Sequence, residues 1–167
     1  MSYLTETLDS KHNRDNFSCG KDILDNYFLT QAKQDVKRKL SACFVLVDKE
    51  TDKISGYYTL SSSSILSILI PDSFRKNLPK SYLSIPTILL GRLAIDKAFQ
   101  GKGVGKFLLI DSLRRCYDIS ESLGTYAVIV DPLDNEAERF YEKYGFVKLP
   151  DSGKMFLPMK TIKELFE

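Results

Sequence analysis

Apolar residues follow a helical period in some segments of this chain and form continuous runs in others. A helix beginning near Lys21 is predicted by one apolar face, made of Ile23, Leu24, Tyr27 and Phe28. Further helices are expected over 31–39, 104–123 and 135–144 and at the C-terminal end. Strands are expected near the start and at 42–47, 54–61, 88–95, 126–130, 146–149 and 155–159. This order, β-α-α-β-β-β-α-β-α-β-β, is typical of a mixed α/β sheet.

Glycine and the apolar pattern refine the expected boundaries. Gly56 is expected to mark a bulge within its strand, and Gly124 and Gly145 are expected to end helices. The apolar residues from Ile65 to Ile70 continue the strand-like pattern of the preceding segment. Beyond Ile70, the prolines between 71 and 86 predict a loop-rich connection.

Three alternate glycines, Gly101, Gly103 and Gly105, lie between the strand expected at 88–95 and the next helix. A glycine has no Cβ, so its backbone can adopt a positive φ and approach a ligand closely. The unpaired amides of a helix N-terminus, together with the helix dipole, favour an anion. The sequence therefore predicts a loop that binds a diphosphate.

The spacing of the glycines limits which diphosphate this is. A P-loop needs four residues before its Gly-Lys and then Ser or Thr, but three residues separate Gly101 from Gly105, and Phe107 follows Lys106. The dinucleotide fingerprint matches only in part, because the third glycine comes one place early. Residues 100–105 fit the Gln/Arg-x-x-Gly-x-Gly/Ala loop that binds the pyrophosphate of coenzyme A. An ordinary glycine-rich turn stays open as an alternative.

Composition narrows the class of protein. The 167 residues carry a formal net charge of +2, too small to indicate nucleic-acid binding by itself. No secretory signal and no apolar run of the roughly 20 residues of a membrane span occur, so a cytoplasmic protein is expected. Cys19, Cys43 and Cys116 are predicted to be reduced thiols. With His12 as the only histidine, we expect neither a metal site nor a histidine-based triad.

A second segment, Asp134–Phe146, accompanies the glycine loop, and together the two resemble the GNAT acetyltransferase superfamily. The resemblance implies an α/β fold with a mixed, mostly antiparallel sheet. Its central parallel pair of strands is splayed, and helices flank the sheet. It further implies a single acetyltransferase domain over residues 1–167 that uses acetyl-CoA.

The resemblance also assigns cofactor contacts. The backbone of Leu93, Ala94 and Ile95 would hold the pantetheine arm and polarise the acetyl carbonyl. The pyrophosphate would lie on Gln100, Gly101, Lys102, Gly103, Val104, Gly105 and Lys106. Asn135 matches a position whose side chain contacts the cofactor, and it is also a natural helix N-cap, with Glu138 completing a capping box.

Tyr141 is the predicted catalytic residue. A phenol with a pKa of about 10 is protonated at neutral pH and can reprotonate the departing thiolate. The alternative is a core residue, because Tyr141 shares an apolar helix face with Phe140. No carboxylate stands out as a general base, which matters less for an α-amine with a pKa of about 7.7–8 than for a lysine amine.

A wider set of motifs resembles the GNAT toxins of bacterial toxin–antitoxin modules. These motifs are Phe17-x-Cys19, Leu24-Asp25-x-Tyr27-Phe28, Gln31-Ala32-x-Gln34-Asp35, Gly56–Ser61, Leu90–Asp96 and Phe140-Tyr141-Glu142-x-x-Gly145-Phe146. The resemblance implies acetylation of the α-amine of aminoacyl-tRNA, which stops translation, and an antitoxin protein as partner. The residues expected to face tRNA are Arg92, Lys33, Lys37, Arg38, Lys39, Arg75, Lys76 and Lys80.

Other interpretations stay open from the sequence. The lysines and arginine at 33–39 also suit a solvated helix end, and Arg92 could instead pair with Asp96. The acceptor could be a small-molecule amine, a protein N-terminus or a lysine. The chain could also be a regulatory module that binds CoA without catalysis. A homodimer is compatible with the sequence but is not indicated by it.

Overall fold

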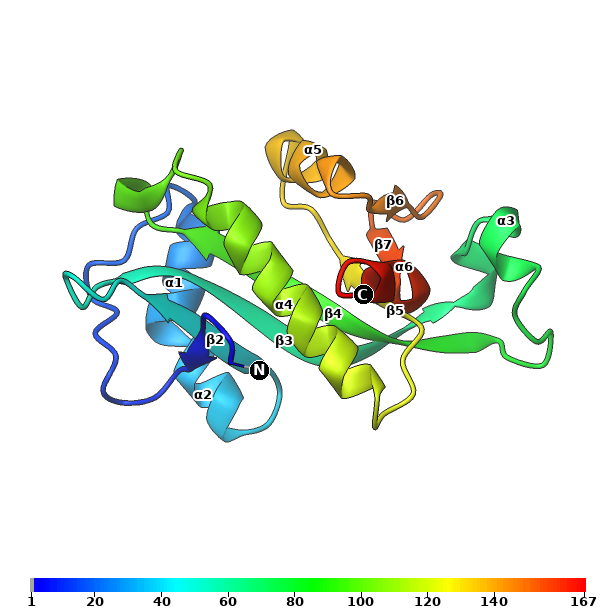
Figure 1. Cartoon of the computed structure of the whole chain (residues 1–167), viewed down its shortest axis with the longest axis horizontal. Helices are drawn as coiled ribbons and strands as arrows, with labels where there is room; N and C mark the ends of the chain where they lie inside the picture. Colours follow the sequence, from blue (N-terminus) through cyan, green and yellow to red (C-terminus); the bar gives the residue numbers. More distant parts are fainter. Residues whose placement is uncertain (1) are drawn as a thin grey trace. The chain divides into compact units, whose positions relative to one another are not determined.

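The computed structural model describes residues 2–167 as an α/β protein (Figure 1). Its elements are β1 (Glu6–Thr7), α1 (Asp22–Thr30), α2 (Ala32–Lys37), β2 (Ala42–Val47), β3 (Ile54–Leu66), η1 (Ser67–Leu69), α3 (Asp72–Arg75), β4 (Ser84–Ile95), η2 (Lys97–Phe99), α4 (Val104–Ser120), β5 (Ala127–Val130), α5 (Asn135–Lys143), β6 (Val147–Lys148), β7 (Met155–Pro158) and α6 (Met159–Glu164). The chain forms two compact units. Unit 1 comprises the residues up to Ser61 with Leu90–Leu113, and unit 2 comprises Ser62–Leu89 with Arg114–Glu167.

The strands pair in the order β1-β2-β3-β4-β5-β7-β6. The β4–β5 pair is parallel, and the pairs β1–β2, β2–β3, β5–β7 and β6–β7 are antiparallel, which confirms the predicted mixed, mostly antiparallel sheet. The parallel pairing joins Thr87–Leu89 to Ala127–Ile129. Because β4 continues to Ile95, its C-terminal part lies outside this pairing, as expected for a splayed pair.

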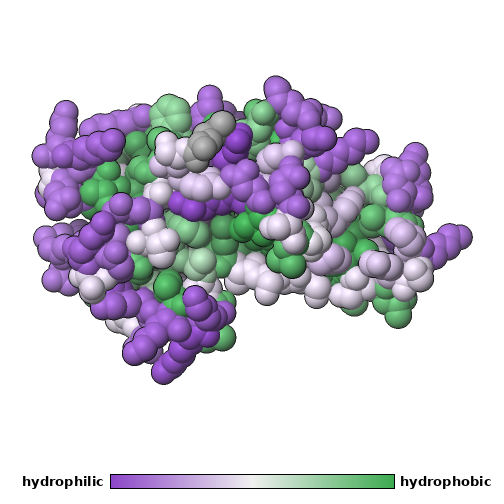
Figure 2. All heavy atoms as spheres, turned by 60° about the horizontal axis from the view of Figure 1, so that its bottom comes forward, coloured by the Kyte–Doolittle hydropathy of each residue, from purple (hydrophilic) through white to green (hydrophobic). Residues whose placement is uncertain are grey.

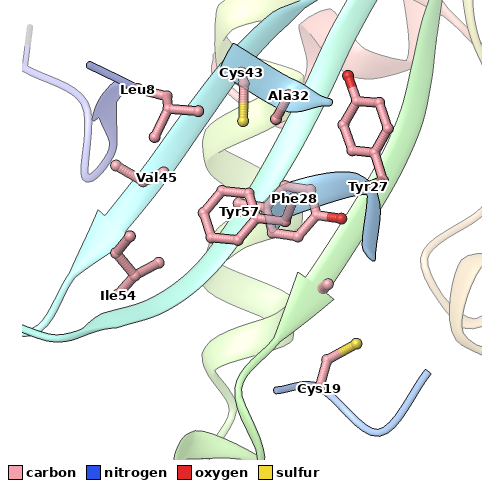
Figure 3. Packing of buried hydrophobic residues seen from close by; sticks show 10 residues of the cluster. Leu8, Cys19, Tyr27, Phe28, Ala32, Cys43, Val45, Ile54 and Tyr57 are labelled. Atoms are coloured by element: carbon pink, nitrogen blue, oxygen red, sulfur yellow. The ribbon is translucent and has the colours of Figure 1, made fainter. Parts of the chain in front are cut away.

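Aromatic rings form the centre of the core of unit 1. The ring of Phe28 stacks on Tyr57 with centroids 4.2 Å apart (Figure 3). Phe17 packs edge-on against both rings. Helix α1 buries Tyr27 and Phe28 in this cluster and packs Leu24 against it. Ile23 was expected on the same face but is 64% exposed, because the buried face of this short helix comprises only the i, i+3 and i+4 positions from Leu24.

Gly56 lies at a point where β3 passes close to β4. A β-bulge occurs at this point of the β2–β3 hairpin, since Leu46 pairs with Gly56 and Val47 with Ile54. This confirms the predicted bulge. A Cβ on Gly56 would lie 2.9 Å from the carbonyl oxygen of Ala94, so any side chain here would push β4 away.

A buried carboxylate joins three segments of unit 1. Asp111 of α4 is 5% exposed and accepts hydrogen bonds from the Leu4 amide at 2.7 Å, the Thr5 hydroxyl at 2.5 Å and the Tyr58 hydroxyl at 2.8 Å. These bonds supply the partners that a buried carboxylate requires. They connect the N-terminal segment and β3 to the helix that follows the glycine loop.

Unit 2 has its own core. Ile65, Ile85, Ile129 and Phe156 belong to one buried cluster, and Phe74 packs edge-on against Phe156 at 5.2 Å. The predicted continuation of the strand through 65–70 is wrong after Leu66, because η1 (Ser67–Leu69) forms a 3₁₀ turn there. Only part of this apolar run is buried, which the pattern of residue types does not show.

Gly145 and Gly124 were each predicted to end a helix, and the structure confirms this for Gly145 only. Gly145 has a φ of +95° and ends α5, as predicted. The expectation for Gly124 is wrong, because α4 already ends at Ser120 and Gly124 is not among the residues with a positive φ. The chain therefore leaves α4 through a turn over Glu121–Leu123.

The helices, the surface and the three cysteines bear on where the chain can function and on its reactivity. Among residues 2–167, no helix is long and apolar enough to cross a membrane. Hydrophilic residues cover much of the face in Figure 2, with hydrophobic ones between them. Cys19, Cys43 and Cys116 are free, which agrees with the predicted reduced thiols, and all three are also buried. Burial raises the pKa of the Cys19 thiol to about 11 and those of the other two to about 12, which makes them poor nucleophiles.

Candidate active site

The glycine loop connects η2 to α4 in unit 1. Gly101 and Gly103 have φ values of +77° and +78°, and a Cβ on either would meet nothing within 4 Å. Glycine is therefore favoured here by the backbone angle and not by lack of space. Gly105 differs from the expectation of a third turn glycine, because it lies in the first turn of α4 without a positive φ.

The amides of this loop are available to a ligand. Within the described part of the chain, the backbone N–H groups of residues 101–106 donate no hydrogen bond to the protein. Helix α4 is 17 residues long, so its dipole adds a partial positive charge at the same place. The side chains of Lys102 and Lys106 are exposed beside it. The loop thus has the geometry of a diphosphate site.

Gln100 holds this loop in place. Its side-chain amide donates to the carbonyl oxygens of Cys19 and Ile95, both at 2.8 Å, and its backbone N–H donates to Lys97 at 3.4 Å. The donors of Gln100 are thus engaged inside the protein. Gln100 thereby holds the loop in place, and its contact with a pyrophosphate stays a prediction, as it does for residues 101–106.

Two carboxylates that the sequence analysis did not select reinforce this arrangement. Asp96 accepts the amides of Ser18 at 3.0 Å and Ala98 at 2.9 Å. Asp25 accepts the Cys19 amide at 2.9 Å. Together they hold the segment before α1 against the end of β4. The local signal was the Asp96–Ala98 spacing, which is typical of an Asx turn.

Leu93, Ala94 and Ile95 differ in what their backbones offer. The N–H of Asp96 donates to Ser55 of β3, and N–H directions alternate along a strand. The backbone groups of Ala94 therefore face β3, and its side chain is only 4% exposed in the core. Leu93 and Ile95 direct their N–H groups away from β3. The geometry therefore favours Leu93 and Ile95 over Ala94 as contacts for a cofactor.

Helix α5 in unit 2 begins one residue earlier than its predicted cap. The N-cap is Asp134, whose carboxylate accepts the Ala137 amide at 2.9 Å, so the assignment of Asn135 as N-cap is corrected. Glu138 completes no capping box and pairs with Lys148 at 2.6 Å. Asn135 is the first residue of α5, and its exposed side chain has no partner among residues 2–167.

Tyr141 combines a packed ring with an unbonded hydroxyl. The residue is 7% exposed, and its ring packs edge-on against Phe140 at 5.4 Å and Phe146 at 5.2 Å. Its hydroxyl forms no hydrogen bond with any described residue. Burial raises the pKa of Tyr141 above its ordinary value, so the phenol stays protonated at neutral pH. The core interpretation and the acid interpretation of Tyr141 are thus compatible.

The predicted tRNA-facing residues fall in both units. In unit 1, Lys33, Lys37, Arg38 and Lys39 are exposed on and after α2, and no described acid pairs with them. In unit 2, Arg75, Lys76 and Lys80 line one groove together with Tyr82. Arg75 already pairs with the carboxylate of Asp72 and donates to Ile68 at 3.3 Å, which leaves Lys76 and Lys80 as the more available cations of this groove.

Arg92 does not make the alternative ion pair with Asp96. Its guanidinium carbon lies 3.4 Å from the centroid of the Tyr27 ring, while the Asp96 carboxylate is bonded by backbone amides. Arg92 is thus held by a stacked aromatic ring.

A mixed sheet with one parallel pair, a glycine loop with free amides after β4 and a tyrosine on the helix after β5 are the features expected of an N-acyltransferase that uses acyl-CoA. Residues 39–148 match the acetyltransferase (GNAT) domain. The chain belongs to this family, and it is an enzyme that uses acetyl-CoA.

The similarity to known proteins covers nearly the whole chain. A tRNA-acetylating toxin of Mycobacterium tuberculosis is 35% identical over 150 residues, which cover 89% of this chain and 87% of that protein. The structure of AtaT complexed with acetyl-methionyl-tRNAfMet superposes with a TM-score of 0.89 at 29% identity, covering 99% of this chain and 100% of that one. A mutant AtaT toxin bound to acetyl-CoA and the C-terminus of the antitoxin AtaR has a TM-score of 0.81 at 27% identity, covering 97% and 96%.

Proposed function

We propose that this enzyme transfers the acetyl group of acetyl-CoA to the α-amine of aminoacyl-tRNA and thereby arrests translation as a toxin. The observation that carries the proposal is the similarity along almost the whole chain to a tRNA-acetylating toxin. The exposed cations of α2 support it, because phosphate contacts need Lys and Arg at the surface but no base-reading pattern.

The residues fit a bound acetyl-CoA. The free amides of residues 101–106, with Lys102 and Lys106 beside them, suit the negatively charged pyrophosphate. The N–H groups of Leu93 and Ile95 suit the amide carbonyls of the pantetheine arm and the acetyl carbonyl. The exposed side chain of Asn135 supplies both donors and acceptors.

Tyr141 has the properties of the general acid. Acetyl-CoA supplies an activated thioester, whose carbonyl carbon the acceptor amine attacks as the C–S bond breaks. We propose that the Tyr141 hydroxyl donates its proton to the leaving sulfur, which yields the CoA thiol. The nitrogen becomes positively charged as it forms the bond to the carbonyl carbon, and it then releases one of its own protons, which restores the phenol. Burial raises the pKa of Tyr141, so the phenol is protonated at neutral pH before the reaction begins.

The acceptor explains why no general base is needed. An α-amine has a pKa of about 7.7–8, and esterification of the amino acid to tRNA lowers it further, so the amine is largely neutral at cellular pH. A lysine amine with a pKa of about 10.4 would need a base near the acetyl group. The proposed mechanism uses no general base and therefore suits the aminoacyl ester.

The proposed activity also implies a domain organisation, a cellular location and a protein partner. Residues 1–167 would act as one acetyltransferase domain, in the cytoplasm where charged tRNA is used. An antitoxin protein would control the enzyme, as the AtaT complex with the C-terminus of AtaR suggests by similarity. A homodimer stays a prediction.

Cell-free translation tests the proposal. Purified protein is added with and without acetyl-CoA. Tyr141→Phe on α5 is compared with Tyr144→Phe, which alters the tyrosine that caps the same helix at its C-terminal end. We expect arrest by the wild type and by Tyr144→Phe only when acetyl-CoA is present, and no arrest by Tyr141→Phe. Unimpaired translation, with acetyl transfer to small amines or peptides instead, would reject the toxin. Binding of CoA without any acetyl transfer would identify a regulatory module.

A further inference from the structure

Arg92 stacks on an aromatic ring in unit 1. Its guanidinium carbon lies 3.4 Å from the centroid of Tyr27, the distance of direct contact between two flat groups. A cation within about 6 Å of a ring centroid is attracted by the negative face of the ring. The ring of Tyr27 is 7% exposed, so it gives Arg92 of β4 a rigid support from α1.

The ring that supports Arg92 is itself held by a buried carboxylate. The Tyr27 hydroxyl donates to Asp35 at 2.8 Å, and Asp35 is only 9% exposed. The side chain of Gln31 donates to the same carboxylate at 3.4 Å. Burial and the bond to Asp35 raise the pKa of Tyr27 to about 12, so its hydroxyl remains a donor at any physiological pH. Figure 3 shows Tyr27 at the margin of the aromatic cluster, apart from the stacked rings of Phe28 and Tyr57.

The guanidinium of Arg92 retains its hydrogen-bonding capacity. An arginine has five N–H donors in one plane. In residues 2–167, no carboxylate or carbonyl accepts from Arg92, and its nitrogens are not among the buried polar atoms that lack a partner. The stack therefore fixes the orientation of a cation whose donor edge is left for an external acceptor.

Asp35 connects this stack to the basic helix α2. It lies in α2 between Lys33 and Lys37, both of which are exposed. The contacts from Arg92 through Tyr27 to Asp35 thus join the strand that precedes the glycine loop to the helix with the densest positive charge of unit 1. The amides of residues 101–106 already provide for the anionic part of the cofactor, so the donors of Arg92 are available to the acceptor.

We propose that Tyr27 and Asp35 are positioning residues, which hold the guanidinium of Arg92 in the orientation that binds a phosphate of the acceptor RNA. That Arg92 faces tRNA is already implied by the resemblance, and the positioning by Tyr27 and Asp35 is what the structure adds. This inference rests on the proposed function in one respect, namely that the acceptor is a nucleic acid. A planar guanidinium can bind two phosphate oxygens at once, which a lysine ammonium cannot.

Steady-state kinetics with separately varied substrates tests the inference. We expect Arg92→Lys, which keeps the charge but not the planar fork, to raise KM for aminoacyl-tRNA about tenfold, as expected for loss of a bidentate contact. Tyr27→Phe keeps the ring and removes the bond to Asp35, so we expect a smaller rise of about threefold, the usual size for one hydrogen bond. A rise in KM for acetyl-CoA of the same size as that for tRNA would overturn the proposal and assign the phosphate to the cofactor.

A double mutant separates positioning from a structural role. If Tyr27 acts through Arg92, then Tyr27→Phe has no further effect on KM for tRNA when Arg92→Lys is already present. Fully additive effects of the two substitutions would overturn the positioning role. Thermal melting of each variant shows whether a change in KM reflects partial unfolding instead, and a KM effect that tracks the loss in Tm would also overturn it.

The binding of unacylated tRNA tests the phosphate contact of Arg92 without requiring catalysis. Fluorescence anisotropy at several salt concentrations compares wild type, Arg92→Gln and Lys49→Gln, where Lys49 is an exposed cation of the β2–β3 hairpin in the same unit. The logarithm of the binding constant is plotted against the logarithm of the salt concentration. We expect the magnitude of this slope to be smaller by about 0.7–0.9 for Arg92→Gln than for wild type, because one phosphate contact is lost. We expect Lys49→Gln to have the same slope as wild type. Wild type that binds tRNA without acetylating charged tRNA would reject the proposed function and leave the phosphate site standing. No binding by wild type, or equal slopes for all three proteins, would overturn the inference.

Discussion

The side-chain amide of Gln100 donates to the carbonyl oxygen of Ile95 at 2.8 Å and so ties the glycine loop to the last residue of β4. The same amide also donates to Cys19, so one side chain holds the loop, the strand and the segment before α1. The free amides of the loop are therefore presented on a fixed backbone. Such preorganisation lowers the entropic cost of binding an anion.

Gln100→Ala is expected to weaken acetyl-CoA binding about five- to tenfold, because two hydrogen bonds that order the loop are lost. Isothermal titration calorimetry with acetyl-CoA measures this directly. Gln34→Ala removes the same side chain from an exposed site on α2 and is the matched control. Equal affinities for both variants would show that Gln100 has no role in ordering the loop.

Tyr141→Phe is expected to lower kcat at least a hundredfold and to change acetyl-CoA affinity less than twofold, because it removes only the proton donor. Tyr144→Phe at the C-cap of this helix is the control, since the Tyr144 ring also packs edge-on against Phe140. Single-turnover acetyl transfer, followed with labelled acetyl-CoA, separates the chemical step from product release. Equal rates for the two variants would contradict the assignment of Tyr141 as the acid.

The pH dependence of kcat/KM is predicted to have only an ascending limb below pH 9. That limb has an apparent pKa of about 7.5–8 or lower and reports loss of the proton from the acceptor amine. Burial raises the pKa of Tyr141 above the usual value of about 10, so the acid stays protonated across this range and no descending limb comes from it. A fall in rate between pH 7 and 9 that is absent from Tyr141→Phe would contradict this account.

Asp111→Ala is expected to reduce the free energy of unfolding by about 2–4 kcal/mol, because it leaves the Thr5 and Tyr58 hydroxyls and the Leu4 amide without their shared acceptor. Urea denaturation followed by circular dichroism measures the change. Asp15→Ala alters an exposed aspartate of the same unit and is expected to change stability by less than about 0.5 kcal/mol. Similar losses for both would show that the Asp111 hydrogen bonds contribute little.

Much of the fold could be predicted from the sequence because its signals are local. The run 42–47 is a strand with those bounds, since β-branched and aromatic residues suit a pleated surface. The apolar pattern was misleading after Leu66 and at Ile23, where apolar side chains are exposed. Residue type predicts what a side chain can bury, whereas the packing of other segments decides whether it does.

The parts of the candidate site that depend on local backbone conformation could be predicted, and those that depend on contacts between distant residues could not. Gly101 and Gly103 could be recognised because their positive φ has a local signature in residue type. Asp134 and Asn135 are adjacent and equally good caps, so only the geometry at the Ala137 amide distinguishes them. The Arg92–Tyr27 stack joins residues far apart in the chain, and a single sequence contains no local sign of such a contact.

The most direct measurement is the mass of the 3′-terminal aminoacyl-adenosine after charged tRNA has been incubated with the enzyme and acetyl-CoA and then digested with nuclease. The account predicts an acetylated aminoacyl-adenosine with wild type and an unmodified one with Tyr141→Phe. An unmodified product with wild type, under conditions in which the same protein acetylates a small amine, would contradict the central claim.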